Sequence, residues 1–228
     1  MSITSNRLIA TAGLCTASAG AIFIGVQINH PPADVAHIVT TEMTIRESAK
    51  IVMSVLALAG LTGIFLRHRS RLGRLGLAGY SLLTVGYLAM FTVECIVAFV
   101  LPTKAHSDPA YVQHVINGAM GHGPTSGIGH LHELFLAMGI GYSIGGLLFG
   151  IALFRARVLA RWASLLLAYA TTSALALAAL PESFSRPFAV PTGVALIGLG
   201  ISLWREERRE ADIVDPPATV RIAEAATR

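Results

Sequence analysis

The sequence predicts an all-α, polytopic membrane protein built as a bundle of about six transmembrane helices. Hydrophobic residues make up 54% of the 228 residues and charged residues only 13%, and the mean hydropathy of +0.64 is too high for a soluble domain of this size. Apolar stretches of about 20 residues, enough to cross a hydrocarbon core as a helix, recur between short charged breaks. We therefore expect a multi-pass protein of the cell membrane.

The apolar stretches use nearly the whole chain and leave no room for a separate soluble catalytic domain. We expect one transmembrane domain over residues 1–204 and a polar, loosely ordered cytoplasmic tail over 205–228. A cleaved signal peptide is an alternative for the first stretch, because Arg7 precedes it, but no small-x-small cleavage site follows. The predicted spans are 7–28, 49–66, 77–101, 132–154, 160–180 and 188–204.

The arginines predict the orientation, because positive residues close to span ends stay in the cytoplasm. One face has Arg7 and three arginine-rich segments around positions 67–74, 155–161 and 205–209. The opposite face has only Arg46, Lys50, Lys104 and Arg186. Both termini are therefore predicted to be cytoplasmic, and the loops 29–47, 102–131 and 181–187 to lie outside.

The basic pI of about 9.4 is explained by this topology, so we expect no nucleic-acid partner. Cys15 and Cys95 lie in apolar runs without metal-binding spacing and are interpreted as buried inert thiols. In the span 132–154, small-xxx-small pairs occur at 141/145 and 146/150. We interpret them as tight packing within one chain, so an oligomer is possible but not required.

Glu94 is the clearest candidate for chemistry. It lies well inside the third predicted span, in the segment FTVECIVAF, with no basic residue of the same helix near enough to pair with it. An ionised carboxylate is costly in hydrocarbon, so Glu94 is expected to be neutral, paired or functional. Its functional interpretation is an acid that delivers a proton to a substrate. Its structural interpretation is a carboxyl group hydrogen-bonded across the bundle to Ser, Thr or Tyr.

Three further carboxylates are expected near the same outer level: Glu47, Glu133 and Glu182. Each is open to neutralisation by an arginine at the membrane surface. Together with Glu94 they suggest an outward-facing polar cavity, in which Glu133 and Glu182 are the candidates for a second catalytic carboxylate. Aromatic residues of the neighbouring spans are the candidate substrate-binding groups, although core or interfacial packing is their commoner role. These aromatic residues are Tyr87, Phe91, Phe99, Phe135 and Tyr142.

Seven of the eight histidines are predicted to lie on the outer face, and only His68 is predicted to lie on the inner face. Imidazoles suit a metal ion, haem iron or proton handling. A metal or haem site is therefore an alternative, with His122, His130 and His132 as its candidates, but HLHE at 130–133 is not HExxH and no cysteine lies nearby. P-loop, dinucleotide-binding, GxSxG and DDxxD motifs are also missing. We therefore expect no metal and no cofactor.

In size, number of helices and scattered intramembrane carboxylates, the chain resembles membrane-bound terpene cyclases of the drimentine and meroterpenoid pathways. This resemblance covers the whole chain but is architectural, and no diagnostic motif matches residue by residue. It implies an isomerase- or lyase-type enzyme of terpenoid biosynthesis that protonates the prenyl chain of a lipophilic substrate taken from membrane lipid. No site position is carried over from the family, but Glu94 suits the role of the initiating acid and Glu182 or Glu133 that of the final proton acceptor.

Two other functions compete with the cyclase. One is a membrane-anchored metal- or haem-binding redox module that uses the outer histidines. The other is a small transporter or channel in which Glu94 couples protons or selects ions. The sequence contains no internal repeat with matched broken helices, which disfavours the transporter.

Overall fold

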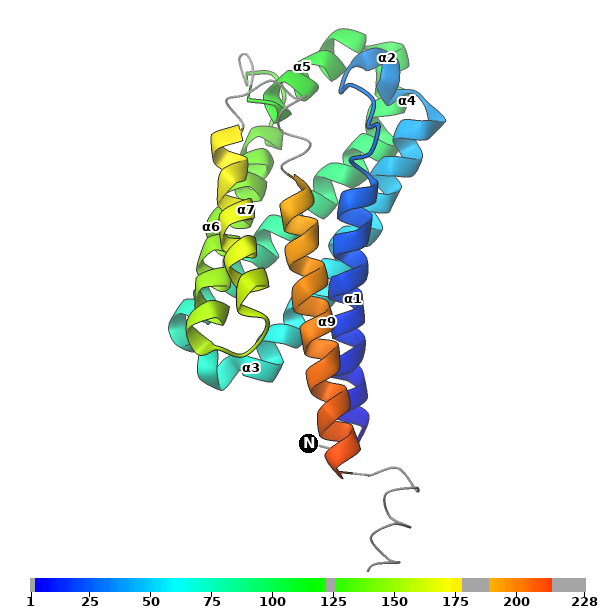
Figure 1. Ribbon diagram of the computed structural model, residues 1–228. Helices are drawn as coiled ribbons and strands as arrows, with labels where there is room; N and C mark the ends of the chain where they lie inside the picture. Colours follow the sequence, from blue (N-terminus) through cyan, green and yellow to red (C-terminus); the bar gives the residue numbers. More distant parts are fainter. Residues whose placement is uncertain (1–2, 122–125, 178–188, 215–228) are drawn as a thin grey trace, which may run out of the picture.

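The computed structural model describes residues 3–121, 126–177 and 189–214, and every regular element in these ranges is a helix (Figure 1). The elements are α1 (Ile3–Gly25), α2 (Val35–Ile38), α3 (Thr41–Cys95), a π-helical turn η1 (Ile96–Val100), α4 (Leu101–Ser107), α5 (Pro109–Ala119), α6 (Leu131–Ala156), α7 (Arg161–Leu177) and α9 (Ala189–Val214).

The long helix α3 is a hairpin of two legs, 41–72 and 74–95, that reverses at Gly73. Gly73 has a φ of 59° and a ψ of −157°, a conformation that glycine adopts without steric cost. The legs are antiparallel, because Thr62 Oγ1 lies 2.9 Å from the Tyr80 hydroxyl and Lys50 Nζ lies 3.8 Å from Glu94 Oε2. The second and third predicted spans are therefore these two legs.

The helical segments run between two ends of the bundle (Figure 1). The start of α1, the Gly73 turn, the connection from α6 to α7 and the end of α9 gather at one end, here called the basic end. The three arginine-rich segments of the sequence lie there. The other end, called the cavity end, has α2, α4 and α5.

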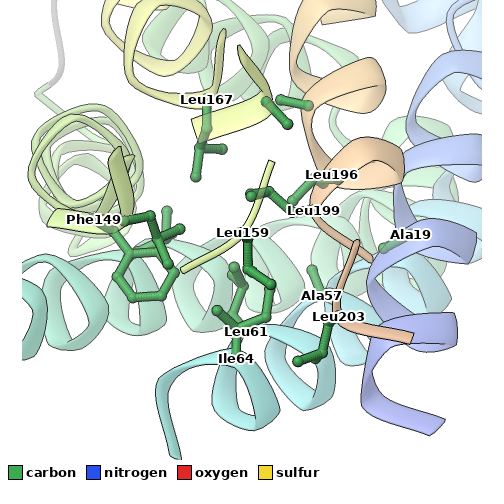
Figure 2. Close-up of a cluster of buried hydrophobic side chains, with 14 of the residues drawn as sticks. Ala19, Ala57, Leu61, Ile64, Phe149, Leu159, Leu167, Leu196, Leu199 and Leu203 are labelled. Atoms are coloured by element: carbon green, nitrogen blue, oxygen red, sulfur yellow. The ribbon is translucent and has the colours of Figure 1, made fainter. Parts of the chain in front are cut away.

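Within the described ranges, three stretches are long and apolar enough to cross a membrane: Asn6–Gly25, Thr41–Ser107 and Leu131–Ala156. Between the helices lies a core made largely of leucine and other aliphatic side chains, contributed by α1, α3, α6, α7 and α9 (Figure 2). Phe149, Leu167 and Leu199 are among its fully or almost fully buried members. Aliphatic side chains such as Leu8, Leu66 and Leu136 are exposed on the outside of the bundle, which suits a lipid environment.

Glycines let α1 and α9 approach backbone to backbone. A Cβ atom added to Gly193 would lie 2.7 Å from the Gly20 carbonyl oxygen, and one added to Gly13 would lie 2.8 Å from the Gly200 carbonyl oxygen. The two glycines of each helix are seven residues apart, so they lie on one face. Such close packing needs small residues, as is typical of helix pairs in membranes.

The α6 glycines serve the same purpose, which confirms the expectation of tight packing within one chain. Gly141 and Gly145 contact the second leg of α3, whereas Gly146 and Gly150 contact α7. Gly139 has no neighbour within 4 Å of the position that its Cβ would take.

The structure corrects two expected boundaries. Residues 102–131, expected to be a loop, contain α4 and α5, and α5 begins with Asp108 as N-cap and Pro109 in its first turn. The polar tail expected from residue 205 continues as α9 to Val214.

Ion pairs explain why α9 continues. Arg67 of α3 donates hydrogen bonds to Glu207 and Glu210 of α9, and the Glu207 side chain is fully buried.

Candidate functional site

A cavity of about 370 Å³ lies at the cavity end, between α3, the connection from α1 to α2, and α5. Apolar side chains form most of its wall, including Met43, Val93, Val97, Leu101, Ile116 and Met120. Apolar pockets with a few convergent polar groups are typical of small-molecule sites.

Four ionisable side chains line the same cavity and contact one another: His30, Glu47, Lys50 and Glu94, here called the cavity cluster. Lys50 Nζ donates a hydrogen bond to Glu47 Oε1 at 2.7 Å and lies 3.8 Å from Glu94 Oε2. His30 Nε2 lies 3.5 Å from the same Glu47 oxygen, so Lys50 contacts both carboxyl groups and His30 contacts one of them. The cluster is well shielded, because the exposed fractions are 3% for Glu47, 4% for His30, 13% for Glu94 and 18% for Lys50.

The α3 hairpin brings three members of the cavity cluster together. Glu47 and Lys50 are three residues apart and therefore lie on one face of the first leg. The reversal at Gly73 places Glu94 of the second leg at their level.

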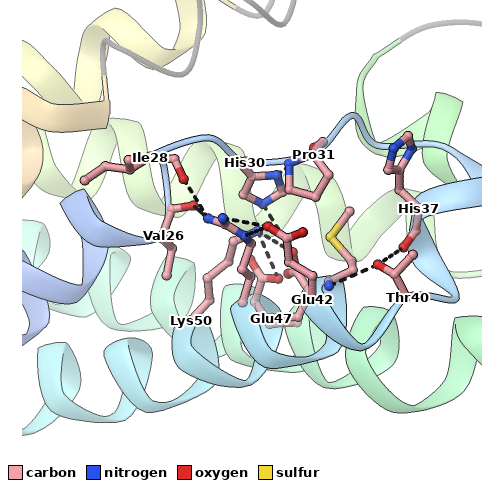
Figure 3. A network of polar contacts seen from close by, with 12 residues as sticks. Val26, Ile28, His30, Pro31, His37, Thr40, Glu42, Glu47 and Lys50 are labelled. Atoms are coloured by element: carbon pink, nitrogen blue, oxygen red, sulfur yellow. Dashed lines mark hydrogen bonds and ion pairs between the residues drawn. The ribbon is translucent and has the colours of Figure 1, made fainter.

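The connection from α1 to α2 supplies His30, and Figure 3 shows how this segment is held. Arg46 donates hydrogen bonds to the carbonyl oxygens of Val26 at 3.1 Å and Ile28 at 2.9 Å. His30 Nδ1 lies 2.8 Å from the Pro31 carbonyl oxygen. Because a carbonyl only accepts, this contact places a proton on Nδ1 and turns Nε2 toward Glu47.

The charges of the cavity cluster favour a proton on one of its two carboxyl groups. Two ionised carboxylates beside the single ammonium group of Lys50 would leave a shielded negative charge, which is costly to bury. With Lys50 charged, one carboxylate and one protonated carboxyl group make the cluster neutral. A neutral cluster is the arrangement that costs least to bury.

The π-helical turn η1 follows Glu94 directly. Pro102 has no N–H to donate, and in a regular helix its ring would clash with the carbonyl group of Ala98, four residues earlier. The helix therefore widens in the turn before Pro102. Val97 of this turn and Leu101 line the cavity. Single π-turns inside α-helices occur frequently at functional sites.

The predicted site residues are only partly brought together. Glu94 and Phe135 line the cavity, whereas Phe91, although half-buried on the same leg of α3 as Glu94, does not. Tyr87 and Tyr142 pack edge to face in the core, with 5.9 Å between ring centroids, and the Tyr142 hydroxyl donates to Thr192 Oγ1 at 3.0 Å.

Of the two predicted second carboxylates, only Glu133 is among the described residues, and it lies away from the cavity. Glu133 is at the start of α6, where its side chain is 66% exposed and 3.7 Å from His130 Nδ1, and it does not line the cavity. Glu182 is outside the described residues. Phe99 is 61% exposed on η1.

The described part of the chain does not bring the candidate metal ligands together. Among the described residues, no group of three or more His, Cys, Asp or Glu side chains is arranged to hold a metal ion. The His130 ring is fully exposed, His132 is half-buried beside it, and His122 is outside the described residues.

Sequence reasoning missed the partners of Glu94. Glu47 was expected near the outer level, but its pairing with Lys50 was not, although their i,i+3 spacing at the start of an apolar run was a usable signal. His30 was not distinguished from the other histidines, because nothing in the sequence shows that its loop folds over α3.

Asp34 is a further acidic group on the cavity wall. Its carboxylate caps α2 by accepting a hydrogen bond from the His37 backbone N–H at 2.8 Å. This hydrogen bond and the His37 ring lower the pKa of Asp34, so Asp34 is ionised near neutral pH and already has a partner.

No known protein family, curated protein or solved structure matches this chain. Its function is therefore inferred from the cavity and the cavity cluster alone.

Proposed function

We propose that the chain crosses the cell membrane six times, with both termini in the cytoplasm. The spanning segments are α1, the two legs of α3, α6, α7 and α9. Support comes from the antiparallel α3 hairpin inside the apolar stretch Thr41–Ser107. The arginines at the basic end assign that end to the cytoplasm, and the cavity then faces outward.

We further propose that the protein is an enzyme that protonates a lipophilic substrate bound in the cavity and so starts the cyclisation of a prenyl chain. The observation that supports this most directly is the carboxyl pair Glu47–Glu94, joined by Lys50, on the wall of a largely apolar cavity. A shielded carboxylic acid next to apolar surface is what protonation of an alkene requires.

The reaction is balanced by the residues of the cavity cluster. The O–H bond of Glu94 breaks as its proton adds to one carbon of a prenyl double bond. The π electrons of a second double bond then close the ring onto the cationic carbon. A neighbouring carbon loses a proton, which restores a double bond, and a carboxylate of the pair accepts this proton. The product is an isomer of the substrate.

Glu47 is the second carboxylate in this scheme, in place of Glu133 and Glu182. Glu47 and Glu94 face the same Lys50 ammonium group, so a proton accepted at either carboxyl group can return to Glu94. Lys50 compensates the charge of the ionised partner at both stages, because it contacts both carboxyl groups. The reaction therefore needs no net proton from outside.

The cavity wall limits the substrate. A volume of about 370 Å³ is at the lower end of the usual range for ligand sites. Phe135 is the one aromatic side chain that lines the cavity among the described residues, so a carbocation meets little π stabilisation there. We therefore expect a single ring closure on a short prenyl chain.

Mass spectrometry of membranes that contain the protein tests this proposal. Prenylated indole or quinol acceptors are supplied, and an isomeric product is sought from the wild type, from Glu94→Gln and from Glu42→Gln. Glu42 is the matched control, because it is 59% exposed and pairs with Arg46 away from the cavity. We expect the isomer with the wild type and Glu42→Gln but not with Glu94→Gln, and one deuterium in the product formed in D₂O. Equal product from Glu94→Gln would contradict the proposal.

Proton-coupled transport is a second candidate, favoured by the ion pairs of Lys50 inside a helix hairpin that the membrane would surround. It is tested in liposomes with a trapped pH indicator. Proton movement that depends on an added substrate, without formation of an isomer, would replace the cyclase with a transporter.

A further inference from the structure

We propose that a groove at the basic end binds the phosphate headgroup of an anionic phospholipid, with an acyl chain lying along its apolar part. This groove, called the α7–α9 groove, has a volume of about 860 Å³. It is separate from the cavity, and the inference rests only on the membrane placement proposed above, not on the cyclase.

The α7–α9 groove has two chemically different parts. Val194, Ile197 and Ile201 of α9 form an apolar strip, and Trp162 of α7 borders it. Arg205 and Arg209 follow on α9, nearer to the basic end. An apolar strip that leads to two arginines at the expected membrane surface matches a phospholipid, whose acyl chain lies deeper than its phosphate.

Arg205 and Arg209 are four residues apart and therefore project from the same face of α9. Both are exposed, and neither has an ion pair or hydrogen bond with any described residue. Two adjacent guanidinium groups without partners offer several N–H donors to one phosphate.

Three other arginines of this end already have partners. Arg67 binds Glu207 and Glu210. Arg161 lies 4.3 Å from the Phe154 ring centroid, and Arg208 lies 5.1 Å from that of Trp204. Arg205 and Arg209 differ from these three arginines, because they line a groove and make no such contact with any described residue.

Two glutamates also line the groove, and both are directed to Arg67 of α3 rather than to Arg205 or Arg209. Glu210 accepts a hydrogen bond from Arg67. Glu206 lies 3.7 Å from Arg67 Nη2 and 3.6 Å from His68 Nε2. Neither glutamate forms an ion pair with Arg205 or Arg209, so both guanidinium groups keep their N–H donors for a phosphate.

Trp162 provides a probe inside the groove. Its side chain is 57% exposed, and the chain has only one other tryptophan, Trp204. In a Trp204→Phe background, fluorescence therefore reports on the surroundings of Trp162 alone. Bromine atoms on a lipid acyl chain quench this fluorescence when the chain lies against the ring.

The experiment uses the full chain in phosphatidylcholine vesicles with increasing fractions of brominated phosphatidylglycerol or, separately, brominated phosphatidylcholine. We expect phosphatidylglycerol to quench Trp162 at a much lower fraction. Arg205→Gln/Arg209→Gln should weaken this preference about 30-fold, about fivefold for each arginine lost near the surface. Arg208→Gln, the matched control on the same helix, should change it less than twofold.

Three results would overturn the proposal. One is equal quenching by the two lipids, and another is an equal loss in Arg208→Gln and in the double variant. The third comes from detergent-solubilised protein: displacement of phosphatidylglycerol by inorganic phosphate at a similar concentration would make the groove a simple anion site without a role for the acyl chain. As a second measurement, native mass spectrometry should find phosphatidylglycerol retained by the wild type and lost from the double variant.

Discussion

At the scale of single residues, Lys50 decides whether the carboxyl pair of the cavity cluster can exist. Glu47 and Glu94 are 3% and 13% exposed, so neither is stabilised by much water. Lys50 contacts both carboxyl groups and supplies the positive charge that makes the cluster neutral. Removing one partner from a shielded ion pair leaves an uncompensated charge, which costs far more than the pair itself contributes.

Replacing Lys50 with Met should therefore lower the free energy of unfolding by about 3 kcal/mol. The double variant Lys50→Met/Glu47→Gln should recover at least half of this loss, because it removes the uncompensated charge as well. Thermal unfolding of the purified proteins in one detergent measures both changes. Additive losses in the double variant would show that the two side chains do not interact.

The sequence singled out Glu94 correctly as a carboxyl group inside an apolar run, but it predicted none of its partners. Those partners come from another leg of a hairpin and from a loop, and the register of the α3 hairpin is set by Gly73 and by packing. Tyr87 and Tyr142 illustrate the same limit. Residues predicted at the same depth in the membrane can face either the core or the cavity, and the rotation of each helix about its axis decides which. Such rotation follows from contacts that a single sequence does not display.

At the scale of elements, small residues determine which helices touch. The glycines seven residues apart on α1 and α9 allow two backbones to meet, and those on α6 serve α3 and α7 on two faces of one helix. Burial of leucines then fills the space between the helices (Figure 2). Any side chain at these glycines must push a backbone away.

Gly20→Leu should therefore destabilise the bundle, by about 1 to 3 kcal/mol for an overpacked contact. A Cβ atom at Gly20 would meet the Gly193 carbonyl oxygen and Ile197. Gly25→Leu is the matched control on the same helix, because nothing lies within 4 Å of the Cβ position there. Equal losses of thermal stability in the two variants would contradict the close packing of α1 and α9.

Arg67 links α3 to the end of α9, and its two hydrogen bonds come from different nitrogens, Nε to Glu207 and Nη2 to Glu210. Lysine has one ammonium group and cannot reproduce this fork. Arg67→Lys should therefore make residues 205–214 exchange amide hydrogens faster, while exchange in α6 stays unchanged. Unchanged exchange at 205–214 would show that α9 continues there without help from Arg67.

The elements with strong apolar signals were predictable, and the interruptions between them were not. Predicted span 132–154 corresponds to α6, Leu131–Ala156. The helix α5 was missed, although Asp108 and Pro109 are typical of a helix start and Val112, Val115 and Ile116 follow with helical spacing. With only 11 residues, α5 is too short to be recognised as a membrane span. It packs at the cavity end in a small hydrophobic cluster, separate from the main core, that includes residues of α2 and α4.

At the scale of the whole molecule, the proposed topology places the cavity outside and the α7–α9 groove inside. Single cysteines test this placement in a Cys15→Ala/Cys95→Ala background, since these are the only native cysteines. Ser70, next to the Gly73 turn, and Asn117 of α5 are both exposed. A membrane-impermeant maleimide should label Asn117→Cys in intact cells and Ser70→Cys only after lysis. The opposite pattern would invert the topology.

The measurement that tests the central claim most directly is the infrared spectrum of the purified protein in the region of the carboxylic acid C=O stretch. A proton held by the Glu47–Glu94 pair gives a band of a shielded, protonated carboxyl group that shifts in D₂O. We predict this band in the wild type and in Glu42→Gln, and its loss in Glu94→Gln, where Glu47 remains as the carboxylate partner of Lys50. A wild-type spectrum identical to that of Glu94→Gln in this region would mean that both carboxyl groups are ionised, and it would contradict an acid at the cavity wall.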